Sequence, residues 1–443
     1  MTTLATATAT VPAPAVVPRV PIPANGVDYR NKIVLAPMVR SGELPSRLLA
    51  LKYGADLVWG PETIDRSMIG AERRVNPRNG TIEFTRMPSN GGRPNKPVKA
   101  SIIYRIDPVR EKGRLIYQMG TANPELAAAR NLSLHTAGWV LPSSAPPDLL
   151  VSILEALVKE IGEPFQIGIS VKIRILSSPE ETEALVTRLV KTGITGLTVH
   201  CRTTPMRPRE RAIRDQLPMI AKICHDAGVA CVMNGDVTSR DQGLALMSEY
   251  GVDGAMIATS AETNSSCFRA EEDGGVAPWR DVVHEYMRFC IESENRLGNT
   301  KYLLNMLIPG KDKEFKDTKL SKTYLDICRG LKFDGLLTAA AAVDQLLGLD
   351  DKWETTAGVP DIQTQSGSKP KAVQNAMESE AARAAGGGAV RTKTPSPAVH
   401  GGGPIRRSSA PQPAKVAQVD AEQPAVEATI PAAQTQAPSQ LTA

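Results

Sequence analysis

Amide, imidazole and ammonium groups stand within or at the ends of short apolar runs of this sequence. The four most distinctive are Gln118, Lys172, His200 and Asn234. Amide and imidazole groups can form directional hydrogen bonds, and a lysine adds a positive charge. Together they suit a planar, carbonyl-bearing and phosphorylated ligand, such as flavin mononucleotide (FMN).

Further residues at the ends of the apolar runs complete this candidate cofactor site. They are Pro37, Met38, Gly235, Asp236, Ala258 and Thr259. A glycine lets a phosphate group approach backbone N–H groups closely, because it carries no side chain. Each residue also has a structural alternative: Lys172 could form an ion pair, His200 could lie in the core, and residues 234–236 could form a simple turn. Their joint occurrence favours the cofactor site.

A strongly basic stretch, Arg202–Arg214, follows His200 and contains five arginines and one acidic residue. Arginine forms bidentate hydrogen bonds with phosphate groups, so this stretch is suited to a polyphosphate backbone. The alternative is a solvated loop without a ligand. The arginines that we assign to RNA contact are Arg202, Arg207, Arg209 and Arg211.

The order of apolar and amphipathic stretches predicts the fold that positions these residues. Seven apolar runs resemble buried strands, and most are followed by a helical stretch, as in parallel βα units. These runs are Lys32–Met38, Ala55–Gly60, Leu115–Gly120, Ile167–Ile175, Gly196–His200, Val229–Gly235 and Gly254–Ala258. A (β/α)8 barrel needs eight strands and gathers its functional groups at their carboxyl ends. We therefore predict an α/β fold, a TIM barrel over residues 26–278, that lacks an intact fourth strand.

The missing strand should lie between Gly120 and Ile167. There the stretch Asn131–Pro147 contains three prolines and has no clear period. Gly138–Leu141 could form a short strand, but the sequence favours a damaged or replaced segment, because proline removes a backbone donor.

Composition divides the rest of the 443 residues into a helical domain and two tails. Residues 1–25 and 352–443 contain one aromatic residue between them, and we predict that both are disordered. Residues 279–351 have helical patterns and a local excess of lysine and arginine, which favours an anionic partner. The residues that we assign to RNA contact here are Lys301, Lys319 and Lys322.

The composition also disfavours several classes of protein. No apolar run is long enough to cross a bilayer, and the N-terminal stretch does not resemble a secretory signal. The six cysteines form no CxxC pair, so we expect reduced thiols and no metal site. We expect a cytoplasmic monomer with a nuclear share; a mitochondrial location stays an alternative.

The motifs, taken in order, resemble those of a known family. They are KIVLAPMVRSGELPSRLLALKYGADLVWGPETID, YQMG, VKIRI, VHCRT, MNGD and AMIAT. This series is similar to the tRNA-dihydrouridine synthases, in particular the eukaryotic tRNA-dihydrouridine(20) type, over Pro23–Leu349. The resemblance implies an FMN-binding barrel and a helical tRNA-binding domain. It also implies reduction of the C5–C6 bond of a D-loop uridine, expected at position 20, with NADPH or NADH as donor.

The resemblance also implies roles for the candidate residues. Pro37 and Met38 would pack against the isoalloxazine ring of FMN, and Gln118 and Lys172 would contact its polar edge. His200 would approach the flavin and its phosphate. The residues that would line the phosphate end are Asn234, Gly235, Asp236, Ala258 and Thr259.

The sequence departs from the family where the fourth strand is expected. The family has an Asn-x-Gly-Cys-Pro turn there, whose cysteine is the general acid, and then a Gly-Gly-Met-Gly-Ala motif; this chain has neither. A one-base shift in suitable codons for the second motif yields Ala-Gly-Trp-Val-Leu-Pro-Ser-Ser, which is residues 137–144. We hypothesise a reading-frame error over Leu134–Pro146, next to a deletion that removed the cysteine turn. The alternatives are a catalytically inactive tRNA-binding protein and another FMN barrel enzyme with a small-molecule substrate.

Overall fold

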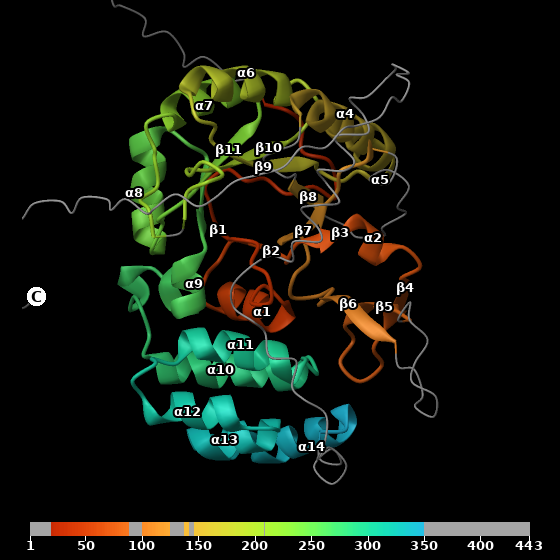
Figure 1. The fold of residues 1–443 in the computed structure, drawn as a ribbon, viewed down its shortest axis with the longest axis vertical. Coiled ribbons are helices and arrows are strands. Elements are labelled where there is room, and N and C mark those ends of the chain that lie inside the picture. The colour runs from red at the N-terminus through yellow and green to blue at the C-terminus, as the bar shows by residue number, and fades with distance from the viewer. Residues whose placement is uncertain (1–18, 88–99, 125–136, 141–145, 208, 350–443) are drawn as a thin grey trace, which may run out of the picture. The chain divides into compact units, whose positions relative to one another are not determined.

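Eight parallel strands form a closed barrel in the computed structural model, which describes residues 19–87, 100–124, 137–140, 146–207 and 209–349 (Figure 1). The strands are β1 (Lys32–Leu35), β2 (Leu57–Trp59), β7 (Leu115–Gly120), β8 (Ala137–Val140), β9 (Ser170–Arg174), β10 (Gly196–His200), β11 (Ala230–Asn234) and β12 (Gly254–Ile257). They pair in the order β1-β2-β7-β8-β9-β10-β11-β12, and β12 pairs with β1 to close the ring. The predicted (β/α)8 barrel is therefore confirmed.

The position of the fourth strand is filled, which corrects the expectation that this strand is missing. β8 pairs with β7 through four residue pairs, Tyr117↔Ala137 to Gly120↔Val140, and with β9 through Trp139↔Val171 and Val140↔Lys172. Strand pairing uses backbone N–H and C=O groups, so four residues without proline suffice between two existing strands. The segments on either side of β8, 125–136 and 141–145, lie outside the described residues.

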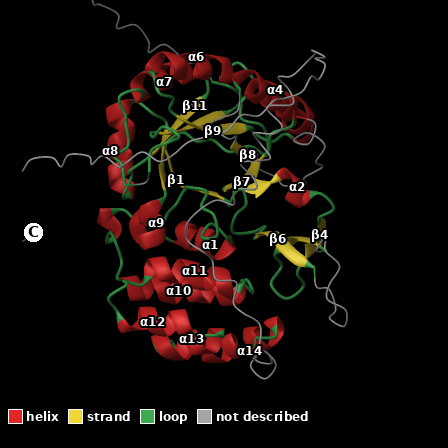
Figure 2. Cartoon of the chain, in the orientation of Figure 1, coloured by secondary structure: helices red, strands yellow, loops and turns green. Residues whose placement is uncertain are grey.

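Helices cover the outside of the barrel, as Figure 2 shows. They are α1 (Leu44–Lys52), α4 (Pro147–Leu157), α5 (Glu163–Phe165), α6 (Pro179–Leu189), α7 (Leu217–Asp226), α8 (Arg240–Tyr250) and α9 (Thr259–Thr263); a π-helical turn, Val158–Gly162, joins α4 to α5. Serine caps start two of them, because Ser178 accepts from the Glu181 N–H and Ser239 from the Gln242 N–H.

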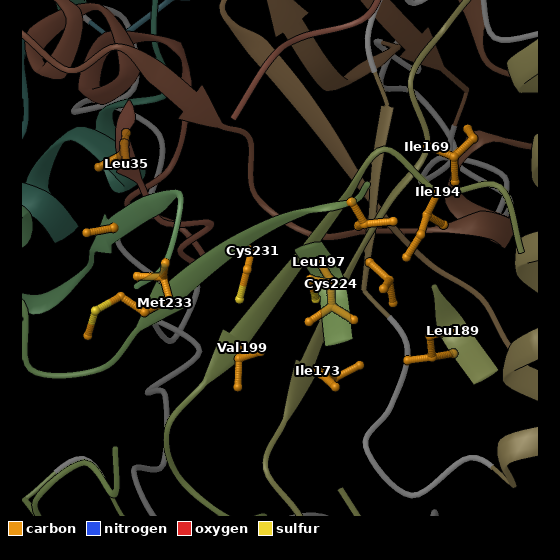
Figure 3. Close-up of a cluster of buried hydrophobic side chains, with 14 of the residues drawn as sticks. Leu35, Ile169, Ile173, Leu189, Ile194, Leu197, Val199, Cys224, Cys231 and Met233 are labelled. Atoms are coloured by element: carbon orange, nitrogen blue, oxygen red, sulfur yellow. The ribbon is translucent and has the colours of Figure 1, made fainter. Parts of the chain in front are cut away.

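Along the barrel strands whose side chains the structure describes (β1, β2, β7 and β9–β12), side chains alternate between the outside and the inside of the barrel, and buried apolar residues form a cluster on each side. Outward residues such as Leu197, Val199 and Met233 pack with helix residues such as Leu189 and Cys224 (Figure 3). Inward residues form a second cluster inside the barrel, which includes Val34, Ala36, Trp59, Ile116, Val232 and Met256. The same alternation turns Gln118 and Asn234 inward, because they lie two positions from the inward residues Ile116 and Val232. Lys172 and His200 lie on the same inner face, because Thr198 is in register with both Val232 and Lys172, and His200 is in register with Asn234.

An insert follows β2 on the rim of the barrel. It contains β3 (Thr63–Ile64), which pairs with β7, and α2 (Asp65–Met68). A three-stranded antiparallel sheet follows, formed by β4 (Glu72–Val75), β5 (Ile82–Arg86) and β6 (Ser101–Ile106).

Five helices follow the barrel: α10 (Trp279–Glu292), α11 (Leu297–Leu307), α12 (Lys313–Leu320), α13 (Tyr324–Leu331) and α14 (Leu337–Leu347). Their buried side chains share one apolar cluster with Leu44, Leu48 and Leu49 of α1, so this helical module packs on the barrel. The start of α10 coincides with the predicted boundary at residue 279. None of the helices in the described ranges has the length and apolar character needed to cross a membrane.

Candidate functional site

A cavity of about 600 Å³ opens at the carboxyl ends of β1 and β9–β12. Its volume lies within the range of ligand pockets, roughly 300–1,000 Å³. Eight of the ten residues assigned to the cofactor line it: Pro37, Lys172, His200, Asn234, Gly235, Asp236, Ala258 and Thr259. The structure therefore brings together residues that are up to 222 positions apart (259 − 37) in the sequence.

The other two predicted residues lie outside the lining of the cavity. Met38 packs against the apolar cluster inside the barrel. Gln118 is buried on β7, and its Oε1 has no hydrogen-bond partner among the described residues, while its Nε2 lies 3.5 Å from Glu62 Oε2. A buried acceptor without a partner costs free energy, so this oxygen is suited to a ligand or water donor.

The cavity changes the protonation of its two central groups. Burial, and then the nearby charge of Arg174, lower the pKa of Lys172 to about 8. Burial, and then the positive charges of Lys172, Arg174 and Arg202, lower the pKa of His200 to about 3. At neutral pH His200 is therefore a neutral hydrogen-bonding group, and Lys172 remains largely charged.

The turn after β11 has an unusual backbone. Gly235 has a φ of 134° and Asp236 a φ of 52°, and both values lie in the region that favours glycine. A Cβ atom at Gly235 would lie 3.0 Å from the Ala212 Cβ and 3.3 Å from the Cys201 Cβ. Asn234 fixes the start of the turn, because its Nδ2 donates to the Met256 carbonyl over 3.1 Å. Only glycine fits the centre of this turn without a shift.

Arg202 lies in the cavity, apart from the other arginines assigned to RNA. It is 6% exposed, pairs with the Asp236 carboxylate, and its Nε donates to the Glu210 carbonyl over 2.7 Å. Arg207, Arg209 and Arg211 are exposed, in the loop that follows. This placement gives Arg202 a role in holding the loop to the turn after β11.

The three lysines assigned to RNA lie in or beside the helical module. Lys319, in α12, and Lys322, just after it, are exposed. Lys301, in α11, is part-buried, and its Nζ donates to the Ser321 carbonyl over 2.7 Å. Lys319 and Lys322 are therefore the more accessible to a partner.

The cofactor prediction missed Arg174, which also lines the cavity. Its Nη1 donates to the Thr203 carbonyl over 3.2 Å, and burial and the charge of Arg202 lower its pKa. The period of two in a strand places Arg174 on the same face as Lys172, so this pattern could have identified it. With Lys172 and Arg202 it makes the cavity positively charged, which suits an anionic ligand.

Comparison with known proteins supports the family resemblance of the sequence motifs. Residues 137–308 match the profile of the family "Dihydrouridine synthase (Dus)". The chain is 42% identical over 340 residues to the tRNA-dihydrouridine(20) synthase of Schizosaccharomyces pombe, over 72% of this chain and 68% of that protein. It is 38% identical over 315 residues to the tRNA-dihydrouridine(20) synthase of Saccharomyces cerevisiae, over 66% of this chain and 80% of that protein. The chain therefore belongs to the dihydrouridine synthase family, a family of oxidoreductases.

Proposed function

We propose that this chain binds FMN in the cavity and acts on tRNA at a D-loop uridine, position 20. The observation that carries this proposal is the single cavity that gathers eight of the ten residues assigned to the cofactor. FMN, when bound, supplies the electrons that reduce the C5–C6 bond of uracil. The names of both yeast relatives include NAD(P)+, which supports NADPH or NADH as the electron donor.

The residues of the cavity fit FMN in charge and in hydrogen bonding. Lys172, Arg174 and Arg202 provide positive charge, and Gly235 lines the cavity at the turn after β11. The unpartnered Gln118 Oε1 offers an acceptor inside the barrel. We assign Lys172 to the polar edge of the ring system, where its charge would stabilise added electron density.

The tRNA would lie across the mouth of the cavity. The loop from Arg202 to Arg214 begins in the cavity lining and carries Arg207, Arg209 and Arg211 on its exposed part. Exposed arginines next to a reaction site are suited to the phosphate groups that flank a target base. The basic helical module, with Lys319 and Lys322, would contact the tRNA farther from the base.

The proton that uracil C5 must receive has no cysteine donor in the cavity. The six cysteines are all buried, and none lines the cavity. Cys201 is the nearest in sequence to His200, but it belongs to the outer apolar layer, and burial raises its pKa to about 11. We therefore propose that the chain as written has little synthase activity. A tRNA-binding protein without catalysis is the second candidate, favoured by this missing donor.

A rescue experiment tests both parts of the proposal. The host is a strain without its own tRNA-dihydrouridine(20) synthase, and dihydrouridine is measured in its tRNA by mass spectrometry. We expect little dihydrouridine with the chain as written, and near-normal levels when the Asn-x-Gly-Cys-Pro turn and the Gly-Gly-Met-Gly-Ala motif that follows it in the family are restored in place of residues 134–146. Full rescue by the chain as written would contradict the claim of inactivity. A transcript that encodes Leu134–Pro146 in this frame, with no neighbouring cysteine codon, would contradict the hypothesis of a reading-frame error.

Flavin content separates the two candidates. The purified enzyme should be yellow from bound FMN under the first proposal. A colourless protein that still binds tRNA in a salt-sensitive manner would favour the non-catalytic candidate. A yellow protein without tRNA binding at physiological salt would point instead to a small-molecule substrate.

A further inference from the structure

The loop after β1, residues 37–43, forms part of the wall of the cavity, and we name it the cofactor loop. Pro37 lines the cavity, and Met38 packs against the apolar cluster inside the barrel. The second half of the loop turns away from the cavity toward α9 and α11. The loop therefore joins the proposed FMN site to helices outside the barrel.

Side-chain contacts hold the second half of the cofactor loop to these helices. The guanidinium carbon of Arg40 lies 4.5 Å from the centre of the Tyr302 ring. The Glu43 carboxylate accepts a hydrogen bond from Asn299. Ser41, which is buried, donates to the Glu262 carboxylate of α9.

The two contacts to α11 come from one face of that helix. Asn299 and Tyr302 are three residues apart, a spacing that places them side by side on a helix surface. Leu303 and Leu304, next to them, are buried in the apolar cluster of the helical module. The helix is thus fixed by its own core and offers a rigid support to the loop.

A tight backbone turn links Arg40 to Met38 within the cofactor loop. The Gly42 N–H donates to the Met38 carbonyl over 2.9 Å, which closes a tight turn. A Cβ atom at Gly42 would lie only 2.6 Å from that carbonyl oxygen, so the turn has no spare room. Arg40 has a φ of 68°, a conformation that costs an ordinary residue free energy and must be held by its contacts.

We infer that α11, through Tyr302 and Asn299, is a positioning element that holds the cofactor loop in the shape the cavity requires. The inference rests on the proposed FMN function for its effect on affinity. Tyr302 and Arg40 are positioning residues in this scheme, because neither lines the cavity. Within the cofactor loop, Pro37 lines it.

A double-mutant cycle tests the Arg40–Tyr302 contact with the full chain and FMN. A cation–π contact at an exposed site corresponds to about a two- to fivefold change in an equilibrium constant. We expect Arg40→Ala and Tyr302→Ala each to raise the Kd for FMN by this factor, and the double variant to be no weaker than either. Tyr302→Phe, which keeps an aromatic face, should bind FMN nearly as the original chain does. Additive effects of the two alanine variants would overturn the inference.

Hydrogen exchange of the cofactor loop gives a second readout that does not need FMN. We expect faster exchange of the backbone amides of residues 39–43 in Tyr302→Ala, and unchanged exchange in Tyr302→Phe. Arg269→Ala is a matched control, because it removes another arginine from a tyrosine ring, that of Tyr53, outside the loop. Unchanged exchange in Tyr302→Ala would overturn the inference. Absence of FMN binding by the original chain would contradict the proposed function and leave this exchange test decisive.

Discussion

At the scale of single residues, the cavity holds His200 neutral and Lys172 charged at neutral pH. Both states follow from burial among several cations, and among the described residues that line the cavity Asp236 is the one acid. Repulsion between its positive charges destabilises such a site when it is empty, and binding of an anion stabilises it. The two residues therefore give the site a pH dependence that a surface histidine or lysine would not have.

His200 should make the FMN-free protein sensitive to mild acid. Its folded pKa of about 3 lies below its unfolded value of 6.5, so the unfolded state takes up a proton first as the pH falls through this window. Stability contributed by the neutral His200 is therefore present above pH 6.5 and is lost toward pH 3. We expect His200→Gln to lose less thermal stability than the original chain between pH 7 and pH 5, measured by calorimetry. Parallel pH profiles of the two proteins would argue against this environment of His200.

The site has no room for a side chain at position 235, where the chain has a glycine. An alanine there combines an unfavourable φ with close contacts to Ala212 and Cys201. Gly251→Ala is the matched control, since it has a positive φ of 65° and open space around it. We expect the control to lower the free energy of unfolding by about 1–2 kcal/mol. Gly235→Ala should cost more than this and should also reduce bound flavin, as measured by denaturant titration and visible absorbance.

At the scale of elements, sequence patterns predicted seven of the eight barrel strands. β9, β10 and β11 were recognisable because each is an apolar run with polar residues at its carboxyl end. β8 was not predicted, because it has only four residues, one of them glycine. Backbone pairing holds it between its neighbours, and this pairing does not require particular side chains. The placement of eight of the residues assigned to the cofactor in one cavity follows from the rule that functional groups gather at strand ends.

Arg202 shows what a local pattern cannot predict. The arginines that follow it, Arg207, Arg209 and Arg211, are exposed, and charge alone grouped Arg202 with them. Its burial depends on Asp236, which is 34 residues away and meets it only because β10 and β11 are adjacent in the barrel. The same holds for Arg40 and Tyr302, whose contact joins the loop after β1 to a helix beyond the barrel.

At the scale of the whole molecule, the exposed arginines at the mouth of the cavity should set the salt dependence of tRNA binding. Each phosphate contact adds about 0.7–0.9 to the slope of log affinity against log salt. We expect the combined change of Arg207, Arg209 and Arg211 to alanine to lower this slope by about two to three. Binding would be measured by titration with tRNA at several salt concentrations.

A control for this prediction uses cations at the opposite end of the barrel. Lys112 and Arg114 are exposed just before β7, and Lys159 is exposed after α4. Changing these three to alanine removes the same charge from the molecule, so any general effect of net charge appears in both variants. An equal loss of slope in the two variants would mean that the mouth of the cavity does not contact the tRNA phosphates.

The backbone pairing of β8 affects whether the barrel of this chain would stay folded in a cell. Proteases and chaperones act on exposed segments and on partly unfolded states, and a closed barrel presents few of either. Because β8 completes the ring through its main chain, the barrel is closed although the sequence lacks the Asn-x-Gly-Cys-Pro turn of the family. Under the proposed function, such a barrel would stay folded and would occupy tRNA in competition with an active enzyme.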